Sequence, residues 1–366
     1  MFGHYSKKAS PCQVIGLAWE RPQEYGFLQG FLVYYGYMKS LRTAGVSQKS
    51  VLVRLDLDLP QVGKSFDTTR LMDGVATLQY LFAHDVKSVT VIAHRGRPNG
   101  KSPRYSLTPI EKLLRAKLTK EENAKLTVLP NLRFDPREEK GSLVFAKALA
   151  KGHDIFVLDA FATAHRNHTS ITFIPQVLPT YAGLQFEKEL KAFEQVLNKP
   201  KRPFVVILGG AKLETKMPLI QALEAKADVI LVGGKLALEA REHEIKGRKL
   251  IIAELTKDGK DISQAAIDQF SRFIKAAGTI VWNGPMGVFE DGKHAHGTKQ
   301  IALAVNSSSG FTLTGGGDTE AAQTKYKAED KIKHISSGGG SMLEYLEKGT
   351  LPGIEAIKAS QDKFKV

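Results

Sequence analysis

A glycine- and lysine-rich stretch, Gly209 to Lys216, carries the first chemical signal in this sequence. It follows the apolar, β-branched run 204–208, which is typical of a buried parallel strand. The two glycines at 209 and 210 allow a sharp turn and the close approach of a ligand to the backbone. Lys212 and Lys216 would share one face of a helix beginning here. Backbone amides, a helix N-terminus and two ammonium groups would bind an anion, although an ordinary strand–turn–helix with two solvated lysines fits this stretch equally well.

Basic side chains follow several apolar runs in the first half of the chain. His94–Pro98 and His165–His168 come after strand-like runs, and we expect Arg70 and Arg133 in loops at the same sheet edge. Each arginine alone is more often a surface ion-pair partner, but several together predict a phosphate or carboxylate site, because guanidinium groups bind such anions through two hydrogen bonds. The spacing of His165 and His168 does not favour a metal, because no third ligand of suitable spacing stands nearby.

Glycine-rich loops follow strand-like runs in the second half. Gly315–Thr319 would set backbone amides against a phosphate, with Asp318 available to Mg²⁺. Gly338–Gly340 and Trp282–Gly287 repeat the arrangement, and Glu290 is free to hold ribose hydroxyls. One such cluster is usually only a tight turn, but three of them predict a nucleotide site.

The common nucleotide and hydrolase motifs are missing from the sequence. A GKS ending occurs at 63–65 and at 100–102, but Asp58 and Arg95 stand where a Walker A box needs its first glycine. Neither a GxGxxG fingerprint nor a GxSxG elbow occurs. An anion site in one half and a nucleotide site in the other instead suggest phosphoryl transfer across a cleft, aided by Arg70, Lys212 and a Mg²⁺ on Asp318.

Short apolar runs alternate with longer amphipathic stretches from residue 50 onward, which predicts an α/β fold with doubly wound parallel sheets. Ligands of such sheets bind beyond the carboxyl ends of the strands. The predicted strands are 51–57, 88–93, 154–158, 204–208, 229–232, 250–253, 279–282, 311–314 and 333–336. The predicted helices include 71–84, 110–117, 188–197, 216–225, 263–276 and 319–326.

Length and composition limit the number of domains, the compartment and the classes of partner that we expect. The 366 residues suffice for two domains, and the net charge of +14 is spread along the chain, which does not favour a nucleic-acid tract. Cys12 is the only cysteine, so a reducing cytoplasm is expected, and no apolar run reaches the roughly 18 residues that span a bilayer. Residues 1–37 differ from the rest in lacking periodicity; we expect an atypical extension outside the fold, with a native start near Met38.

In its motifs the chain resembles the phosphoglycerate kinase family from about Met38 to Ile357. The motifs that carry the resemblance are Arg54-Leu-Asp56, His94-x-Gly-Arg-Pro98, Asn131-Leu-Arg-Phe134, Ala164-His-Arg166, Gly209-Gly-Ala-Lys212, Trp282-Asn-Gly-Pro-Met-Gly-Val-Phe-Glu290, Gly315-Gly-Gly-Asp-Thr319 and Gly338–Gly340.

The resemblance implies two Rossmann-like domains joined by a hinge helix: 38–186 for 3-phosphoglycerate and 187–350 for the nucleotide, with the tail 351–366 returning to the first. It implies a cytoplasmic, usually monomeric enzyme that reversibly transfers phosphate between ATP and 3-phosphoglycerate, giving ADP and 1,3-bisphosphoglycerate, with Mg²⁺. No nucleic-acid or membrane partner is expected.

Site residues follow from the resemblance, motif by motif. Arg70 and Lys212 would stabilise the transferred phosphoryl group, and Asp318 would lie near the metal. The positions that would contact 3-phosphoglycerate are Asp56, Asp58, Arg70, His94, Arg97, Arg133 and Arg166. The positions that would hold the nucleotide are Lys216, Asn283, Pro285, Glu290, Gly316, Gly317, Asp318, Thr319, Gly338 and Gly339.

Several positions depart from the family pattern. Asp58 stands in place of a substrate-contacting asparagine and Arg95 in place of a leucine, and we expect these two side chains to form an ion pair. Leu158 and Ala162 replace an asparagine and a glycine, and Lys235 replaces the third glycine of a nucleotide-side triplet. The stretch between 235 and 280 is also shorter than in typical members, so nucleotide affinity or base preference would differ.

The shortened stretch prompts an alternative function: a nucleotide-binding protein that keeps the fold with weak or lost kinase activity. Retention of Arg70, Lys212, Asp318 and Glu290 argues against it. A nucleic-acid-binding role, suggested only by the basic charge, is a minor alternative, because aromatic and basic residues do not cluster.

Overall fold

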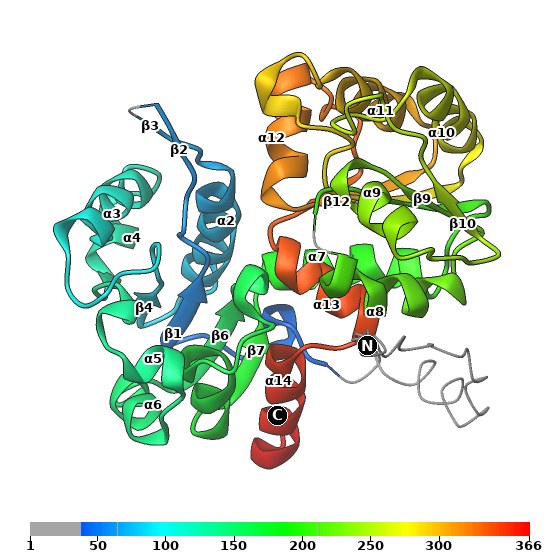
Figure 1. The fold of residues 1–366 in the computed structure, drawn as a ribbon. Helices are drawn as coiled ribbons and strands as arrows, with labels where there is room; N and C mark the ends of the chain where they lie inside the picture. Colours follow the sequence, from blue (N-terminus) through cyan, green and yellow to red (C-terminus); the bar gives the residue numbers. More distant parts are fainter. Residues whose placement is uncertain (1–37, 64, 212) are drawn as a thin grey trace, which may run out of the picture. The chain divides into compact units, whose positions relative to one another are not determined.

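Two parallel β-sheets, each flanked by helices, form the part of the chain that the structure describes (Figure 1). This structure is a computed structural model, and it describes residues 38–63, 65–211 and 213–366. Met38–Val366 form one unit by their internal contacts. The extension 1–37 and Lys212 lie outside the described residues.

The first sheet has five strands in the order β5-β4-β1-β6-β7, all parallel. The central strand pairs on both sides, with Val53 opposite Val91 and Val157. Its side chains are buried on both faces, as continuous apolar runs in parallel sheets predict. The strands are β1 (Ser50–Leu55), β4 (Ser88–Ile92), β5 (Leu126–Val128), β6 (Ile155–Asp159) and β7 (Thr180–Ala182); a separate hairpin joins β2 (Gln61–Val62) to β3 (Ser65–Phe66).

Helices cover the first sheet through apolar residues at helical spacing. In α2 (Thr69–Ala83), Leu71, Val75 and Leu78 are buried on one face, and this face packs into the same core as β1 and β4. The other helical elements are α3 (Thr108–Arg115), α4 (Lys120–Ala124), α5 (Arg137–Lys140) and α6 (Leu143–Ala150), with short turns η1 (Leu41–Thr43), η2 (Pro103–Tyr105), η3 (Leu132–Phe134), η4 (Phe161–Thr163), η5 (Thr169–Phe173) and η6 (Ile174–Gln176).

The second sheet has six parallel strands in the order β10-β9-β8-β11-β12-β13. Its strands are β8 (Phe204–Leu208), β9 (Val229–Val232), β10 (Leu250–Ile252), β11 (Thr279–Asn283), β12 (Phe311–Gly315) and β13 (His334–Ser336). Its helices are α8 (Leu213–Glu224), α9 (Gly234–Glu242), α10 (Gln264–Ala276), α11 (His296–Ser307), α12 (Gly317–Tyr326) and α13 (Gly339–Lys348), with the turn η7 (Phe289–Asp291).

Helix α7 (Leu184–Leu197) lies between the two sheets and contacts β6 of the first and β11, β12 and β13 of the second. Its buried Glu189 accepts hydrogen bonds from His334 at 2.7 Å and from the Ser337 backbone amide at 2.7 Å. The last helix, α14 (Pro352–Phe364), returns to β7, η5 and η6 (Figure 1). There Ser360 donates to the Leu178 carbonyl at 2.8 Å.

The predicted α/β fold of two parallel sheets is confirmed, and β8 and β9 have the predicted bounds. Five of the six predicted helices begin two to four residues earlier than predicted, and two of these shifts move site residues. Because α2 begins at Thr69, Arg70 lies in its first turn and not in a loop, as we had predicted. Because α12 begins at Gly317, Asp318 also lies in a first turn. The prediction had no strand at β2, β3, β5 or β7, which have two or three residues each, and no helix at α4, α5, α6, α9, α11, α13 or α14.

Candidate functional site

A pocket of about 210 Å³, called here the basic pocket, opens at the carboxyl ends of β1, β4 and β6. It brings together every residue predicted to contact 3-phosphoglycerate. Residues 337–339, from the end of β13 to the first residue of α13, also line it, so both halves contribute. Its lining consists of Asp56, Asp58, Arg70, His94, Arg97, Arg133, Ala162, Thr163, His165, Arg166, Ser337, Gly338 and Gly339.

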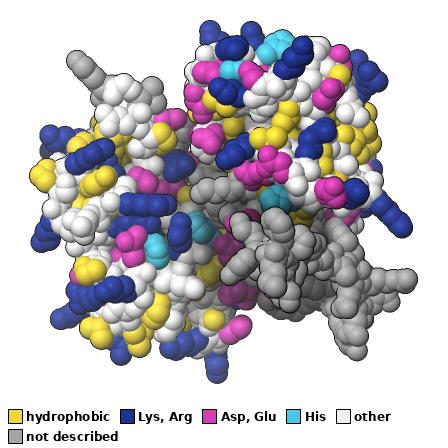
Figure 2. Space-filling model, in the orientation of Figure 1, with side chains coloured by type: hydrophobic (Ala, Val, Ile, Leu, Met, Phe, Trp, Pro, Cys, Tyr) yellow, Lys and Arg dark blue, Asp and Glu magenta, His cyan; other side chains and the backbone are white. Residues whose placement is uncertain are grey.

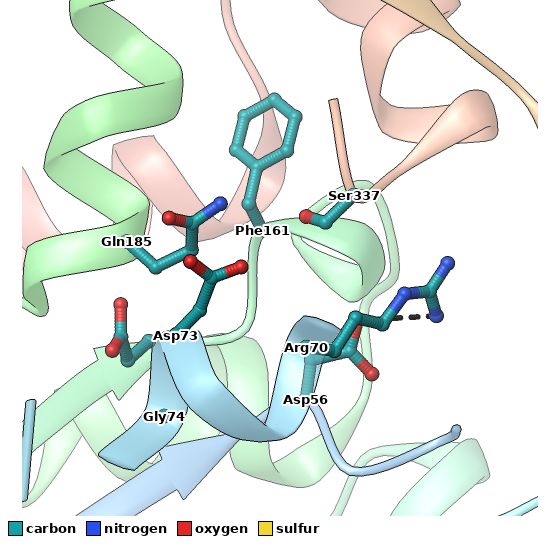
Figure 3. Close-up of a pocket in the computed structure, with 8 residues that line it drawn as sticks. Asp56, Arg70, Asp73, Gly74, Phe161, Gln185 and Ser337 are labelled. Carbon is teal, nitrogen blue, oxygen red and sulfur yellow. Dashed lines mark ion pairs between the residues drawn. The ribbon is translucent and has the colours of Figure 1, made fainter. Parts of the chain in front are cut away.

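Arg70 faces the pocket from α2 and is held by the end of β1. Its Nη1 lies 3.4 Å from Asp56 Oδ2 (Figure 3). The same nitrogen donates to the Asp58 carbonyl at 3.2 Å. Burial raises the pKa of Asp56, and the charges of Arg70 and Arg54 oppose that rise. Asp56 Oδ2 is buried and accepts no hydrogen bond from any described residue. This oxygen therefore relies on the charge of Arg70.

His94 is buried directly after β4, between a cation and a carboxylate. Its Nδ1 lies 2.9 Å from Arg54 Nη2, and its Nε2 lies 3.5 Å from Asp58 Oδ2. Burial, with the charges of Arg54 and Arg133, holds the pKa of His94 well below its usual value. The imidazole is therefore neutral at pH 7.

The predicted Asp58–Arg95 ion pair is wrong for the described residues. Asp58 Oδ1 accepts from the Gly96 backbone amide at 2.8 Å instead. Arg95 turns away, donates to the Ser106 carbonyl at 2.9 Å and lies over the Phe66 ring at 4.9 Å. The Gly96 amide therefore binds the Asp58 carboxylate, and the charges of Arg54 and Arg133 lie close enough to interact with it.

Three further arginines complete the basic pocket. Arg133, on η3, donates to the Gly96 carbonyl at 2.7 Å and pairs with Glu139 at 3.0 Å, and burial lowers its pKa. Arg97 and Arg166 are exposed, and within the described part of the chain neither has a carboxylate within 4.0 Å. Their guanidinium groups are therefore available to an anion in the pocket.

A smaller cavity of about 10 Å³, the size of one water, lies behind Arg70 (Figure 3). Among its lining residues are Asp56, Asp73, Gln185, Ser337 and the buried Asp159. Asp159 accepts from Thr77 Oγ1 and from the Phe186 backbone amide, and it thereby caps the start of α7. Burial raises the pKa of Asp159 to about 6, and the bond from Thr77 opposes that rise.

Replacement of Asp159 by asparagine should change the pH dependence of stability. An aspartate with a pKa of 3.8 unfolded and about 6 folded stabilises the fold below pH 3.8, and this contribution is lost as the pH rises through 6. Asparagine keeps an acceptor for the Phe186 amide, donates to Thr77 Oγ1 where the aspartate accepts from it, and does not titrate. Between pH 4 and pH 7 the free energy of unfolding of the variant should therefore rise relative to the parent by up to about 3 kcal/mol. Urea unfolding at both pH values measures this, and parallel curves would contradict it.

In the second half, glycine loops that follow β8, β9 and β11 touch one another. Gly210 donates to the Pro285 carbonyl at 2.8 Å, and the Gly234 amide donates to the Met286 carbonyl at 3.0 Å. A side chain at Gly209 would collide with the Pro285 carbonyl, and one at Gly284 with Gly209. The sequence places glycine at these points because only bare backbone fits there.

Lys216 lies under this junction on α8. Its buried ammonium donates to the Gly209 carbonyl at 2.8 Å and to Asn283 Oδ1 at 2.7 Å. Burial lowers the pKa of Lys216 to about 8, against the attraction of Asp318. Lys216 therefore braces the loop while remaining charged at neutral pH.

The other predicted nucleotide residues lie around the ends of β11 and β12. Asn283 donates to the Gly315 carbonyl at 2.7 Å, and the hydroxyl of Thr319 accepts from the Gly284 amide at 2.7 Å, so both connect loops. Gly316 and Gly317 begin α12, with Gly316 at a φ of 104° that favours glycine. Glu290 is exposed on η7. The structure does not bring these residues into the basic pocket, whereas it does place Gly338 and Gly339 there.

Asp318, in the first turn of α12, presents an exposed carboxylate that fits a Mg²⁺. Across the described ranges, no group of three His, Cys, Asp or Glu side chains has a metal-binding arrangement. Mg²⁺ commonly takes one or two protein carboxylates and completes its shell with water and phosphate oxygens. Asp318 therefore fits a metal that arrives with a nucleotide.

Some residues that line or support the basic pocket had no role in the sequence-based prediction. Ser337 lines both cavities. Glu320 of α12 lies near Arg70: burial raises the pKa of Glu320, and the charge of Arg70 opposes that rise. Arg54 was visible only as part of a motif, and Glu138 behind it carried no signal. Ser170 links these two side chains by hydrogen bonds, and no spacing in the sequence indicates that link.

Comparison with known proteins identifies relatives along nearly the whole described chain. The family model described as phosphoglycerate kinase matches residues 41–251 and 238–349. The phosphoglycerate kinases of Thermus thermophilus and Leptospira biflexa are 35% and 36% identical, over 88% of this chain and 100% and 99% of their own lengths. Among solved structures, phosphoglycerate kinase from Coxiella burnetii superposes with a TM-score of 0.77 at 27% identity, covering 88% of this chain and 99% of that one. The enzyme from Pyrococcus horikoshii gives 0.74 at 25% identity, covering 89% and 100%.

A search for membrane-spanning helices finds none of sufficient length and apolarity within the described ranges.

Proposed function

This chain belongs to the phosphoglycerate kinase family, phosphotransferases with a carboxyl acceptor, and we propose that it reversibly transfers a phosphoryl group between ATP and 3-phosphoglycerate, giving ADP and 1,3-bisphosphoglycerate. The observation that carries this proposal is the basic pocket, in which four arginines and a neutral histidine face one space. Calorimetric titration with 3-phosphoglycerate tests it. Binding should weaken about tenfold on Arg166→Ala, and equal affinity would contradict the assignment.

The anionic acid would lie in the basic pocket. Arg97 and Arg166 would bind its charged groups directly, since no ion pair with a described residue competes for them. Arg133, His94, Asp56 and Asp58 would fix its orientation. Gly338 and Gly339 would line the opposite wall with backbone, because a side chain at Gly338 would collide with Ala162.

The nucleotide would bind at the carboxyl ends of β8, β11 and β12. Lys216, Asn283 and Pro285 support the loop that would contact its phosphates, Glu290 would hold ribose hydroxyls, and Gly316–Thr319 would offer backbone amides at the start of α12. Asp318 would hold Mg²⁺, which neutralises phosphate charge when it arrives with ATP. The nucleotide half would extend over 187–350 and the acid-binding half over 38–186, with α14 packed against the latter.

In the reaction, the chain's own residues would position the reactants and compensate charge. The carboxylate of 3-phosphoglycerate, oriented in the basic pocket, would attack the terminal phosphorus of ATP while the bond from that phosphorus to the bridging oxygen breaks and ADP leaves with that oxygen. Arg70 and Lys212 would stabilise the charge on the phosphoryl group in transit. Closure of the two halves would bring the reactants together and exclude water. We also propose that the protein is a cytoplasmic monomer. Light scattering of the protein as it elutes from a size-exclusion column tests the monomeric state.

Asp58→Asn should strengthen binding of 3-phosphoglycerate. Asparagine keeps an acceptor for the Gly96 amide and removes a negative charge from the pocket. The Asp58 side chain is 37% exposed, so solvent screens it, and we expect the KM for 3-phosphoglycerate to fall about 3–10-fold. The KM for ATP should stay constant. Steady-state kinetics at fixed ionic strength measure both, and a higher KM for the acid would contradict the prediction.

Nucleotide binding should weaken as the pH rises through about 8, because the free enzyme's Lys216 then loses its proton. Below that pH the ammonium is charged and attracts phosphate; above it, the neutral amine does not. Titration of ADP between pH 6.5 and 9.5 measures this. Lys216→Gln should flatten the profile at weaker affinity, and a profile unchanged by the substitution would assign the titration to another group.

A further inference from the structure

A network of hydrogen-bonded, buried polar side chains reaches His94 on the side of the ring away from the basic pocket. It begins at Glu138 on α5, passes through Ser170 on η5 and Arg54 at the end of β1, and ends at the His94 ring. Glu138 and Ser170 are fully buried, and Arg54 is 1% exposed. Neither Glu138 nor Ser170 lines the basic pocket, so substrate would not touch them.

The direction of each hydrogen bond in this network follows from which groups can donate and which can accept. Glu138 accepts from the Ser170 backbone amide at 3.0 Å and from the Ser170 hydroxyl at 2.6 Å. Since that hydroxyl proton is used, Ser170 Oγ acts as an acceptor for Arg54 Nε at 3.0 Å. Arg54 Nη1 donates to the Leu55 carbonyl, which leaves Nη2 directed at His94 Nδ1 at 2.9 Å. A guanidinium only donates.

His94 Nδ1 must therefore accept, and the proton of the neutral ring must lie on Nε2. That nitrogen faces the basic pocket, 3.5 Å from Asp58 Oδ2. The charged and titratable groups around the ring are Arg54, Arg70, Arg133, Asp58 and His168, and the cations among them disfavour a second proton on the ring.

We propose that Glu138, Ser170 and Arg54 are positioning residues that keep His94 in the tautomer with its proton on Nε2, so that the ring donates a hydrogen bond to an oxygen of the anionic acid. The proposal rests on the proposed role of the basic pocket. The other tautomer would set a lone pair against a substrate oxygen and a proton against the Arg54 guanidinium, both of which are repulsive. Glu138 also compensates the buried charge of Arg54, together with Asp56.

The test reads the tautomer of His94 directly, by long-range proton–nitrogen NMR of the side chain, with the signal assigned by its loss in His94→Gln. Ser170→Ala removes the acceptor of Arg54 Nε. Arg54→Lys keeps the charge but cannot reach both Ser170 and His94 in the planar geometry of a guanidinium. Ser142→Ala is the matched control, because the Ser142 side chain caps α6 in the same half and has no hydrogen bond to any member of this network.

The parent and the control should show one tautomer, with the proton on Nε2. Ser170→Ala and Arg54→Lys should show a mixture and a KM for 3-phosphoglycerate raised about 3–10-fold, with the KM for ATP unchanged. A single unchanged tautomer in folded Ser170→Ala would overturn the proposal, as would the same mixture in Ser142→Ala. If His94→Gln left the KM for the acid unchanged, the substrate role of His94 would fail even where the tautomer responds, so the two failures are distinguishable.

Discussion

Arg70→Ala should lower turnover about 10²–10³-fold, the effect expected on losing one preorganised charge that faces the transition state. Arg70 is well placed for this role, because α2 carries it into the basic pocket and Asp56 and the Asp58 carbonyl hold its Nη1. A charge held in this way needs little reorganisation as the phosphoryl group transfers. The KM for ATP should change little. Steady-state kinetics with both substrates varied measure the two effects.

Two further variants sharpen this prediction. Arg70→Lys keeps the charge but not the forked geometry, so it should recover only part of the lost turnover. Arg104→Ala removes an exposed arginine of η2 outside the basic pocket and should leave turnover unchanged. Turnover close to the parent value in folded Arg70→Ala would assign charge stabilisation to other residues.

Lys212→Ala should also lower turnover about 10²–10³-fold. This residue lies outside the described residues, so the prediction rests on its motif and on its distance along the chain from Lys216. The ammonium of Lys216 already has two oxygen partners, Gly209 O and Asn283 Oδ1, and it therefore suits support of the loop. Lys212, the other lysine of the motif, is then the better candidate to stabilise the phosphoryl group during transfer.

The two lysines should separate kinetically. Lys212→Ala should act mainly on kcat, whereas Lys216→Ala should mainly raise the KM for ATP and lower stability, because two buried acceptors lose their donor. Lys299→Ala, on the exposed side of α11, is the control for loss of a lysine charge. Equal effects of the first two variants on kcat and KM would show that their roles are not distinct.

Sequence patterns predicted the fold well where the local signal is strong. β8 and β9 are continuous apolar runs, and β-branched residues at this length are rarely anything but buried strands. β5 and β7 have three residues each, but so do β10 and β13, which were predicted, so short length alone does not explain the two missed strands. α11 has no side-chain cap at Ala295, and α13 begins inside a glycine triplet, so the usual start signals are missing from both.

For the site, the resemblance to the family predicted which side chains would meet but not how they would pair. The lining of the basic pocket contains every residue predicted to contact the acid. The expected Asp58–Arg95 pair failed, because Arg95 can reach Ser106 and Phe66 through a loop whose path sequence alone does not reveal. On the face drawn in Figure 2, Lys and Arg side chains are scattered among acidic ones, and only the pocket geometry singles out the arginines that matter.

The central claim is that this chain is an active kinase for 3-phosphoglycerate, and a coupled assay tests it most directly. Purified protein is incubated with Mg²⁺, ATP and 3-phosphoglycerate, and 1,3-bisphosphoglycerate is followed through its reduction by a coupling dehydrogenase. Turnover that depends on all three components and falls in Arg70→Ala is the predicted result. No turnover above background from folded protein that still binds nucleotide would contradict the claim and favour a binding protein that has lost its kinase activity.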